Sequence, residues 1–374
     1  MIPLAKPVVG EREEELVLEA LRSGWLSLGP RLRQFEEAFA ERLGVAHTAA
    51  VSSGTAGLHL SVRACGIEPG DEVITSPFSF IASSNCVLYE NAKPVFVDID
   101  PVTLNIAPDA AAAAVGERTT GLLPVHIFGW PADMAGFERL AADRKLWIVE
   151  DTCEALGAVH EDGSTVGGRG NLSVFAFYAN KQITTGEGGM VVCPSAEVKA
   201  RIDSERNQGR APDMGWLDHD RLGFNYRLSD IACAIGVAQV ERLDELLSGR
   251  DRVAALYAEA LAGIEGIELP AGTGAGQAKR SWFVYVVKLP PGVDRDGCIE
   301  ALRARGVDSK PYLPAIHLYG FYRERFGHRE GEFPNAEDAA RRCLALPFFP
   351  GLTESEVAQV AEALTGVLQA ATAA

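Results

Sequence analysis

Hydrophobic positions in the first 150 residues switch repeatedly between helical and strand spacing. Between Pro30 and Gly44 apolar residues recur at every third or fourth position, which predicts one amphipathic helix. Short runs rich in β-branched residues follow, separated by helix-length segments at 55–65 and 134–144. The predicted strands are 48–52, 72–75, 94–99, 120–125 and 146–150. Because most of them are apolar along their whole length, the pattern predicts a doubly wound α/β domain with a mostly parallel sheet.

The second half of the chain loses this alternation. Thr353 and Glu356 have the spacing of a capping box at the start of a terminal helix. We place a domain boundary near 245–250, which predicts a large domain over 1–247, N-terminal segment included, and a smaller domain over 248–374. The elements predicted beyond the large sheet are helices at 228–247, 251–261, 294–305 and 353–368 and a strand at 283–289.

The composition is that of a soluble globular protein, with 47% hydrophobic and 23% charged residues. A formal net charge of −16 argues against nucleic-acid and anionic-membrane partners, because surfaces that follow phosphates carry a basic excess. The 7 cysteines include no CxxC pair, so neither a disulfide framework nor a metal site is predicted. No signal-peptide pattern is present and no apolar run reaches the roughly 18 residues of a membrane span, so we expect a cytoplasmic protein.

A Ser-Gly-Thr sequence follows the first predicted strand, in VSSGTAGLHL (51–60). Backbone amides at a helix N-terminus, with the hydroxyl of Thr55 and the close approach that Gly54 allows, form a cup suited to a phosphate group. The alternative is an ordinary strand-to-helix turn that needs a serine cap and a glycine. Taken alone, the segment favours the simpler interpretation.

The strand at 146–150 delivers Asp151 at its carboxyl end, the edge where α/β sheets bind their ligands. Glu154 lies three residues later, so one helical turn would aim both carboxylates the same way. A carboxylate at this place can pair with a protonated pyridine nitrogen. A capping aspartate at a strand–helix junction is an equally good interpretation of Asp151 in isolation.

Lys181 lies between an aromatic strand and a glycine-rich stretch, in NLSVFAFYANKQITTGEGGM (171–190). A lone lysine is most often a solvated surface residue. Phe175, Phe177 and Tyr178 precede this one, however, and are expected to desolvate its amine and make it reactive.

Residues 209–230 concentrate cationic, amide and aromatic side chains. Such groups bind phosphates or carboxylates, and a solvated polar loop is the alternative. The residues concerned are Arg210, Arg221, Asn225, Tyr226 and Arg227.

The order of these segments resembles that of the DegT-type sugar aminotransferases, also called the DnrJ or StrS family, over nearly the whole chain. The matching segments are SGWLSLGP (23–30), SSGTAGL (52–58), SPFSFIASSN (76–85), PVHIFG (124–129), VEDTCEALGA (149–158), FAFYANKQITTGEGGM (175–190), LGFNYRLSD (222–230) and PAIHLYGFYRERFG (314–327). The resemblance implies the aspartate-aminotransferase-like α/β fold of pyridoxal 5′-phosphate (PLP) enzymes. In that fold a large domain with a mostly parallel mixed sheet is joined to a smaller C-terminal α+β domain.

By this resemblance Lys181 is the catalytic residue that holds PLP covalently and moves the proton during transfer of the amino group. Asp151 would bind the pyridine nitrogen, and Phe80 would stack on the ring. Gly54 and Thr55 would hold the phosphate with backbone and hydroxyl donors.

The resemblance also implies a homodimer with shared active sites, in which Asn225 reaches the phosphate of the neighbouring subunit's cofactor. The substrate would be a nucleotide-linked keto-sugar, and L-glutamate would be the amino donor. The residues expected to bind this substrate are Trp25, Ser27, Tyr226, Arg227 and His317.

Two positions depart from the pattern of the family. Ala176 stands where a serine hydroxyl usually contacts the phosphate. Glu154 stands where Gln or His is common, and we expect it near the cofactor's phenolic oxygen. Members that resemble perosamine synthases also carry glutamate here and aminate C4 of a 4-keto-6-deoxyhexose, so amination at C4 is favoured over C3.

Three alternatives stand beside this prediction. The first is a C3 keto-sugar or cyclitol aminotransferase of the same fold. The second is a non-catalytic relative that binds PLP or sugar, which the presence of Lys181, Asp151 and Asn225 disfavours. The third is an NAD-dependent Rossmann enzyme, which we set aside because no GxGxxG follows an early strand.

Overall fold

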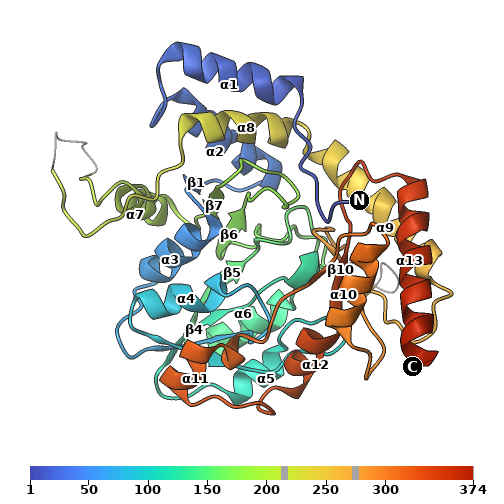
Figure 1. The fold of residues 1–374 in the computed structure, drawn as a ribbon. Helices are drawn as coiled ribbons and strands as arrows, with labels where there is room; N and C mark the ends of the chain where they lie inside the picture. The colour runs from blue at the N-terminus through green and yellow to red at the C-terminus, as the bar shows by residue number, and fades with distance from the viewer. Residues whose placement is uncertain (212–217, 272–277, 374) are drawn as a thin grey trace.

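The computed structural model of the protein describes residues 1–211, 218–271 and 278–373. Its largest element is a mixed sheet in the order β1-β7-β6-β5-β4-β2-β3 (Figure 1). The antiparallel member is β7, which pairs with β1 and β6, and the remaining neighbours are parallel. The strands are β1 (Thr48–Val51), β2 (Glu72–Thr75), β3 (Lys93–Phe96), β4 (Thr119–Leu123), β5 (Trp147–Asp151), β6 (Leu172–Ala176) and β7 (Gly189–Val192). The predicted mostly parallel mixed sheet is confirmed.

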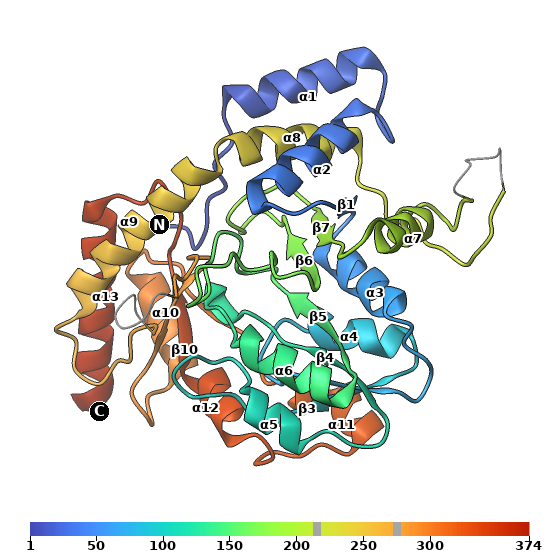
Figure 2. The ribbon, with the colours of Figure 1, turned by 180° about the vertical axis from the view of Figure 1, so that it is seen from behind.

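Helices cover both faces of this sheet (Figures 1 and 2). The α-helices of the large part are α1 (Glu11–Ser23), α2 (Pro30–Leu43), α3 (Gly54–Ala64), α4 (Ala82–Tyr89), α5 (Pro108–Ala113), α6 (Met134–Arg144), α7 (Ala196–Arg206) and α8 (Asp230–Glu241), with the short 3-10 helix η1 (Ile127–Gly129). Pro30 begins α2 as predicted, and Gly44 follows it in the left-handed conformation, at φ 72°. Where these helices pack against the sheet, they bury its apolar side chains.

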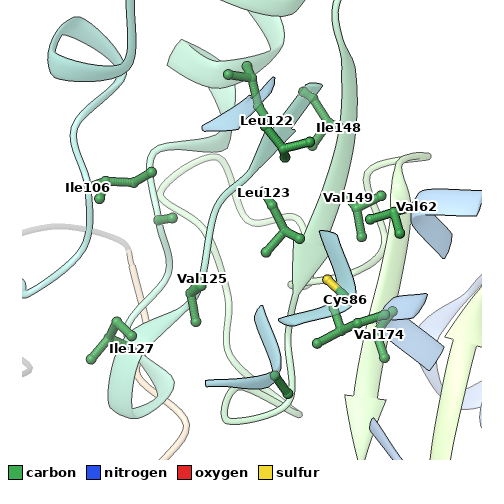
Figure 3. Close-up of a cluster of buried hydrophobic side chains, with 14 of the residues drawn as sticks. Val62, Cys86, Ile106, Leu122, Leu123, Val125, Ile127, Ile148, Val149 and Val174 are labelled. Atoms are coloured by element: carbon green, nitrogen blue, oxygen red, sulfur yellow. The ribbon is translucent and has the colours of Figure 1, made fainter. Parts of the chain in front are cut away.

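Successive residues of β6 enter different cores, because successive side chains of a strand point to opposite faces. Leu123, Val149 and Val174 join the cluster that includes Val62 of α3 (Figure 3). Phe175, the neighbour of Val174, packs instead in the cluster formed with α2 and α8. This division decides which side chains of β6 are directed to which face.

A smaller antiparallel sheet, in the order β8-β10-β9, forms the C-terminal part. The elements here are α9 (Leu243–Leu261), β8 (Tyr285–Lys288), α10 (Arg295–Ala304), β9 (Lys310–Pro311), η2 (Ile316–Leu318), α11 (Gly320–Phe326), α12 (Pro334–Arg342), β10 (Cys343–Leu346) and α13 (Glu354–Ala373). Figure 1 shows α9, α10 and α13 around this sheet. The α+β character predicted for the smaller part is confirmed, and the Thr353 amide bonds the Glu356 carboxylate at 2.8 Å as the capping box requires.

The helical region after residue 228 differs from the prediction. The break falls at Arg242, between α8 and α9, and not near 248–250. The predicted boundary at 247/248 therefore lies inside α9, whose Leu246 packs in the core with α2 and α8 while Val253 packs in the C-terminal core. Ile2 also packs in that C-terminal core, so the N-terminal segment contacts the smaller part. In the described part of the chain, none of the helices has the length and apolar character needed to cross a membrane.

Candidate active site

A pocket of about 610 Å³ lies at the edge of the large sheet where the parallel strands end. The segments that follow β1, β2, β5 and β6 line it, and Phe283 and Tyr312 of the C-terminal part belong to its wall. Because neighbouring parallel strands end at one edge, residues far apart in sequence converge here. A separate cavity of about 590 Å³ near α5 and α6 is lined by none of the predicted site residues.

The N-terminus of α3 reaches the pocket through Gly54 and Thr55. Ser53 caps the helix, because its hydroxyl accepts a hydrogen bond from the Ala56 amide at 3.1 Å. A Cβ added to Gly54 would lie 2.8 Å from Cβ of Ala176, so glycine is needed for the helix to approach β6. The turn thus has the serine cap of the simpler interpretation and also exposes a helix N-terminus to the pocket, which suits an anion.

Asp151 ends β5 and lines the pocket with only 5% of its surface exposed. Its Oδ2 accepts a hydrogen bond from the Ser83 hydroxyl at 2.7 Å, and its Oδ1 accepts one from the Cys153 amide at 3.1 Å. Buried carboxylates need such donors to stay charged. No helix starts directly after Asp151, so a helix-capping role does not account for its position.

Lys181 extends into the same pocket, with 14% of its side chain exposed. Its Nζ lies 3.9 Å from the centre of the Phe283 ring and 4.0 Å from Oε1 of Glu154. An aromatic face and a carboxylate at these distances both attract an ammonium group. The amine is therefore held at a defined place, opposite an aromatic wall.

The aromatic residues expected to desolvate Lys181 are not those that do so. Phe175 and Phe177 lie on the other face of the sheet, where their rings pack edge-on against Phe39 at 5.2 and 5.6 Å. The prediction was wrong for these two because Phe175 of β6 and Phe177, just beyond its end, both pack in the core on the face away from the pocket. Of the three aromatic residues named, Tyr178 lines the pocket, and Phe283, from a distant segment, covers the amine.

Glu154 is a buried residue that lines the pocket. Its Oε2 accepts a hydrogen bond from the Phe128 amide at 2.8 Å, while Oε1 is the atom 4.0 Å from Lys181 Nζ. Burial raises the pKa of Glu154, and the charge of Lys181 and the Phe128 hydrogen bond partly oppose that rise. One oxygen is thus committed to the backbone and the other faces the amine.

Two aromatic side chains at the pocket are strongly exposed. Phe80 is 63% exposed and Tyr178 is 53% exposed, although both belong to the lining. Large apolar side chains left open to solvent in a concave site are available to stack on a planar ligand.

Comparison with known proteins identifies the family. Residues 7–365 match the DegT/DnrJ/EryC1/StrS aminotransferase family. The chain belongs to this family. It is 37% identical over 370 residues to GDP-perosamine synthase of Caulobacter vibrioides, with 98% of each chain covered.

Solved structures agree with this assignment. The aminotransferase TlmJ from Streptoalloteichus hindustanus is 34% identical and superposes with a TM-score of 0.92, covering 100% of both chains. DesV of S. venezuelae, solved in complex with a ketimine intermediate, is 34% identical with a TM-score of 0.88, covering 95% of this chain and 93% of that one. The DegT-family chain is therefore a PLP-dependent sugar aminotransferase with the predicted aspartate-aminotransferase-like fold.

The pocket of this aminotransferase has groups that suit each part of PLP. Lys181 provides an amine, Asp151 a buried carboxylate, and the N-terminus of α3 a set of backbone amides. Phe80 offers an open ring face. Ala176 lines the pocket beside Gly54, so a methyl group stands at the N-terminus of α3 where a serine hydroxyl was expected from the family pattern. When bound, PLP supplies the electron sink that amino-group transfer needs.

Four other predicted residues form a second group, outside the pocket lining of their own chain. Ser27 pairs with Ser229, just beyond Arg227, so the loop of Trp25 and the segment of Tyr226 lie close together. The side chain of Tyr226 bonds His59 at 3.2 Å, and that of Arg227 bonds Asn207 at 3.0 Å. Their expected contact with the sugar stays a prediction.

The structure differs from the expectation for His317. This imidazole is fully buried, and its Nε2 lies 3.0 Å from Oε1 of Glu337. It is not part of the pocket lining, whereas Pro314 and Tyr319 of the same segment are. The 3-10 turn at 316–318 directs His317 inward and leaves the neighbouring side chains at the pocket, so a direct sugar contact is not available to it in this conformation.

Two residues of the site carry no clear signal in the sequence. Ser83, which bonds Asp151, lies in the first turn of α4, three residues after Phe80, and nothing in the local sequence distinguishes it from the neighbouring serines. Phe283 is 102 positions from Lys181 and belongs to an ordinary apolar run, so only the fold reveals its contact with the amine.

Glu154→Gln is expected to retain most of the activity and to remove a pH dependence of stability. A carboxyl group whose pKa is raised by folding stabilises the protein fully below its unfolded pKa, and this contribution is lost as pH rises through the folded pKa. Since the pKa of Glu154 is raised, the free energy of unfolding of the glutamine variant should increase relative to wild type across that window. Denaturant titrations at a series of pH values measure this difference.

Glu154→Ala leaves the buried Phe128 amide unpaired and should cost about 1–3 kcal/mol of stability. Glu161→Gln, at an exposed carboxylate, is the matched control and should follow wild type at every pH. If wild type and Glu154→Gln have parallel stability curves, and the visible absorbance of their bound cofactor titrates identically, the carboxyl group of Glu154 does not titrate in this range.

Proposed function

We propose that this aminotransferase moves the amino group of L-glutamate to C4 of a nucleotide-linked 4-keto-6-deoxyhexose. The observation that carries the proposal is Glu154, which lies 4.0 Å from Lys181 in the pocket. Glutamate at this position resembles the perosamine-synthase type, and the chain is 37% identical to GDP-perosamine synthase over 370 residues. The surroundings of Glu154 support a role beside the amine of Lys181. Its Oε2 accepts the hydrogen bond from the Phe128 amide, so Oε1 is left to contact the ligand.

In this proposal each group of the pocket has one task. The amine of Lys181 holds the cofactor and moves the proton between the donor or sugar carbon and the cofactor. Asp151, fixed by Ser83, keeps the pyridine nitrogen protonated. The amides of α3 at Gly54 and Thr55 bind the phosphate.

Amination of a panel of nucleotide-linked keto-sugars by purified enzyme tests the proposal. The panel holds 3-keto and 4-keto hexoses with each common nucleotide, offered with glutamate, and NMR of the product gives the carbon that gains nitrogen. The expected result is a 4-amino-4,6-dideoxyhexose. A 3-amino product would contradict the C4 proposal and leave the enzyme class unchanged. Replacing glutamate by other amino acids tests the donor separately.

We further propose a homodimer in which Asn225 serves the pocket of the neighbouring subunit. The Asn225 side chain is exposed and is not part of the pocket lining of its own chain, although the next residue is joined to the end of β1 by the bond from the Ser52 amide to the Tyr226 carbonyl at 2.8 Å. Exposed apolar side chains accompany this segment and the loop that pairs with it, with Trp25 at 59% and Leu222 at 71% exposure. Such side chains are typical of a surface that a second subunit covers.

Mixed dimers test the shared site. Asn225→Ala should weaken activity, and mixing it with inactive Lys181→Ala should restore one complete site in each heterodimer. Activity above that of both parents is therefore expected once subunits have exchanged, which differently tagged chains can verify. Verified exchange without any gain in activity would show that Asn225 acts on its own chain.

A further inference from the structure

Arg250 of α9 is a buried cation behind the wall of the pocket. It is 5% exposed, and its guanidinium donates to three backbone carbonyls. Nη2 donates to the Lys181 carbonyl at 2.7 Å, and Nη1 donates to the Phe283 carbonyl at 3.0 Å and, at the longer distance of 3.5 Å, to the Trp282 carbonyl. One rigid planar group therefore joins the residue that carries the amine to the residue whose ring covers it.

Burying the charge of Arg250 in this way lowers the stability of the fold. Among the described residues no carboxylate forms an ion pair with Arg250, and Nε has no hydrogen-bond partner. Burial lowers the pKa of Arg250 to about 10, which reflects the cost of keeping its charge away from water. Buried ionic groups can often be replaced by apolar side chains without loss of stability, so packing alone gives little reason for an arginine here.

The side chain of Gln182, the residue after Lys181, holds the same loop by two further hydrogen bonds. Gln182 donates from Nε2 to the Glu154 carbonyl at 2.6 Å and to the Ser281 hydroxyl at 3.1 Å. The loop of Lys181 is thus attached to the segment at 281–283 through Gln182, and to both Phe283 and α9 through Arg250. With the backbone held in this way, the position of the Lys181 amine depends mainly on the conformation of its own side chain.

We propose that Arg250 is a positioning residue for Lys181, which sets the backbone of the lysine against the ring of Phe283 so that the amine is held at the cofactor. The inference rests on the proposal that Lys181 holds the cofactor. Arg250 itself contacts neither substrate nor cofactor in this account, because the atoms it bonds are carbonyls of the pocket wall. Small displacements of a reacting group lower the rate of catalysis more than they weaken binding.

Arg250→Met removes all three hydrogen bonds and the charge, and Arg250→Lys keeps the charge but not the fork that spans the carbonyls of Lys181 and Phe283. Arg252→Met is the matched control, because Arg252 lies on the same helix and also donates to backbone carbonyls, those of Pro350 and Leu352, outside the pocket. Each variant is assayed as the holoenzyme, with rates divided by the measured content of bound cofactor. The visible absorbance of the cofactor is titrated with pH in parallel.

The expected result is a fall in kcat of about 100-fold for Arg250→Met, with KM for the sugar within about threefold of wild type. Arg250→Lys should also lose kcat. The pH midpoint of the absorbance change should rise in Arg250→Met, because loss of a nearby positive charge favours the protonated form, and stay near wild type in Arg250→Lys. The other titratable side chains that line the pocket are the same in all variants: Asp151, Cys153, Glu154, Tyr178, Glu187, Tyr312 and Tyr319. Arg252→Met should resemble wild type in all these measurements.

A kcat per bound cofactor within twofold of wild type, with an unchanged pH midpoint, would overturn the proposal and leave Arg250 a purely structural residue. If Arg250→Met does not fold, Arg250→Lys decides the question by its kcat alone. If Lys181 does not hold the cofactor, this failure is distinguished from failure of the positioning role, because borohydride treatment of the wild-type holoenzyme then labels another residue. Labelling of Lys181 together with wild-type kcat in the Arg250 variants would reject only the positioning role.

Discussion

Lys181→Ala is expected to abolish transamination while the protein stays folded. Among the described residues that line the pocket, Lys181 carries the one amine, so no other side chain there can form the same covalent link to the cofactor. The fold should survive because the amine contributes only its approach to Phe283 and to Glu154, at 3.9 and 4.0 Å. Activity should fall to the level of the assay background, and the circular dichroism spectrum should match wild type.

Borohydride trapping identifies the lysine directly. Reduction of the wild-type holoenzyme, digestion and mass spectrometry should place the cofactor on the peptide that contains Lys181. Lys279→Ala is the matched control, because this lysine pairs with Asp251 at 3.1 Å and is not part of the pocket lining. It should retain activity and label normally. Cofactor found on any other peptide of the wild-type enzyme would refute the assignment.

Asp151→Asn is expected to lower kcat by about 100-fold or more while PLP remains bound, since a preorganised charge contributes on this scale to catalysis. The amide cannot keep the pyridine nitrogen protonated, so the ring loses its strength as an electron sink. Asparagine retains one oxygen, which can accept the bond from Ser83, and loses the bond from the Cys153 amide, so one of the two contacts that hold the side chain should remain.

A capping aspartate serves as the control for this substitution. Asp133 caps α6, accepting a hydrogen bond from the Gly136 amide at 2.9 Å, and asparagine caps helices equally well. Asp133→Asn should therefore have normal kcat. Stopped-flow measurement of each half-reaction gives the rate, and cofactor absorbance gives the occupancy. Near-wild-type turnover in Asp151→Asn at full occupancy would remove the role assigned to Asp151.

Much of the large domain could be predicted from local patterns. The strand at 72–75 and the helix at 134–144 have the predicted bounds, and the strand at 146–150 is shifted by one residue. These elements are buried and their hydrophobic spacing is imposed by the core they enter, so the pattern is strong. The break between α8 and α9 was misplaced because the two helices run on with only Arg242 between them, so no proline or glycine marks the boundary.

The sequence by itself determined the class of the enzyme and several of the residues that line its pocket. Lys181, Asp151 and the Ser-Gly-Thr turn are each carried by a local motif, since every motif places one side chain at the end of one strand. The family relation, which the comparison confirms, follows from the order of those motifs along the chain.

The tertiary structure alone decided which distant residues complete the site. Phe283 and Arg250 reach Lys181 from the C-terminal part, and His317 turns inward to Glu337 although its neighbours line the pocket. Local sequence cannot show such contacts, because they depend on how the smaller sheet and α9 pack against the carboxyl edge of the large one. Strand alternation likewise sent Phe175 to the opposite face, a consequence of the register of β6 and not of its composition.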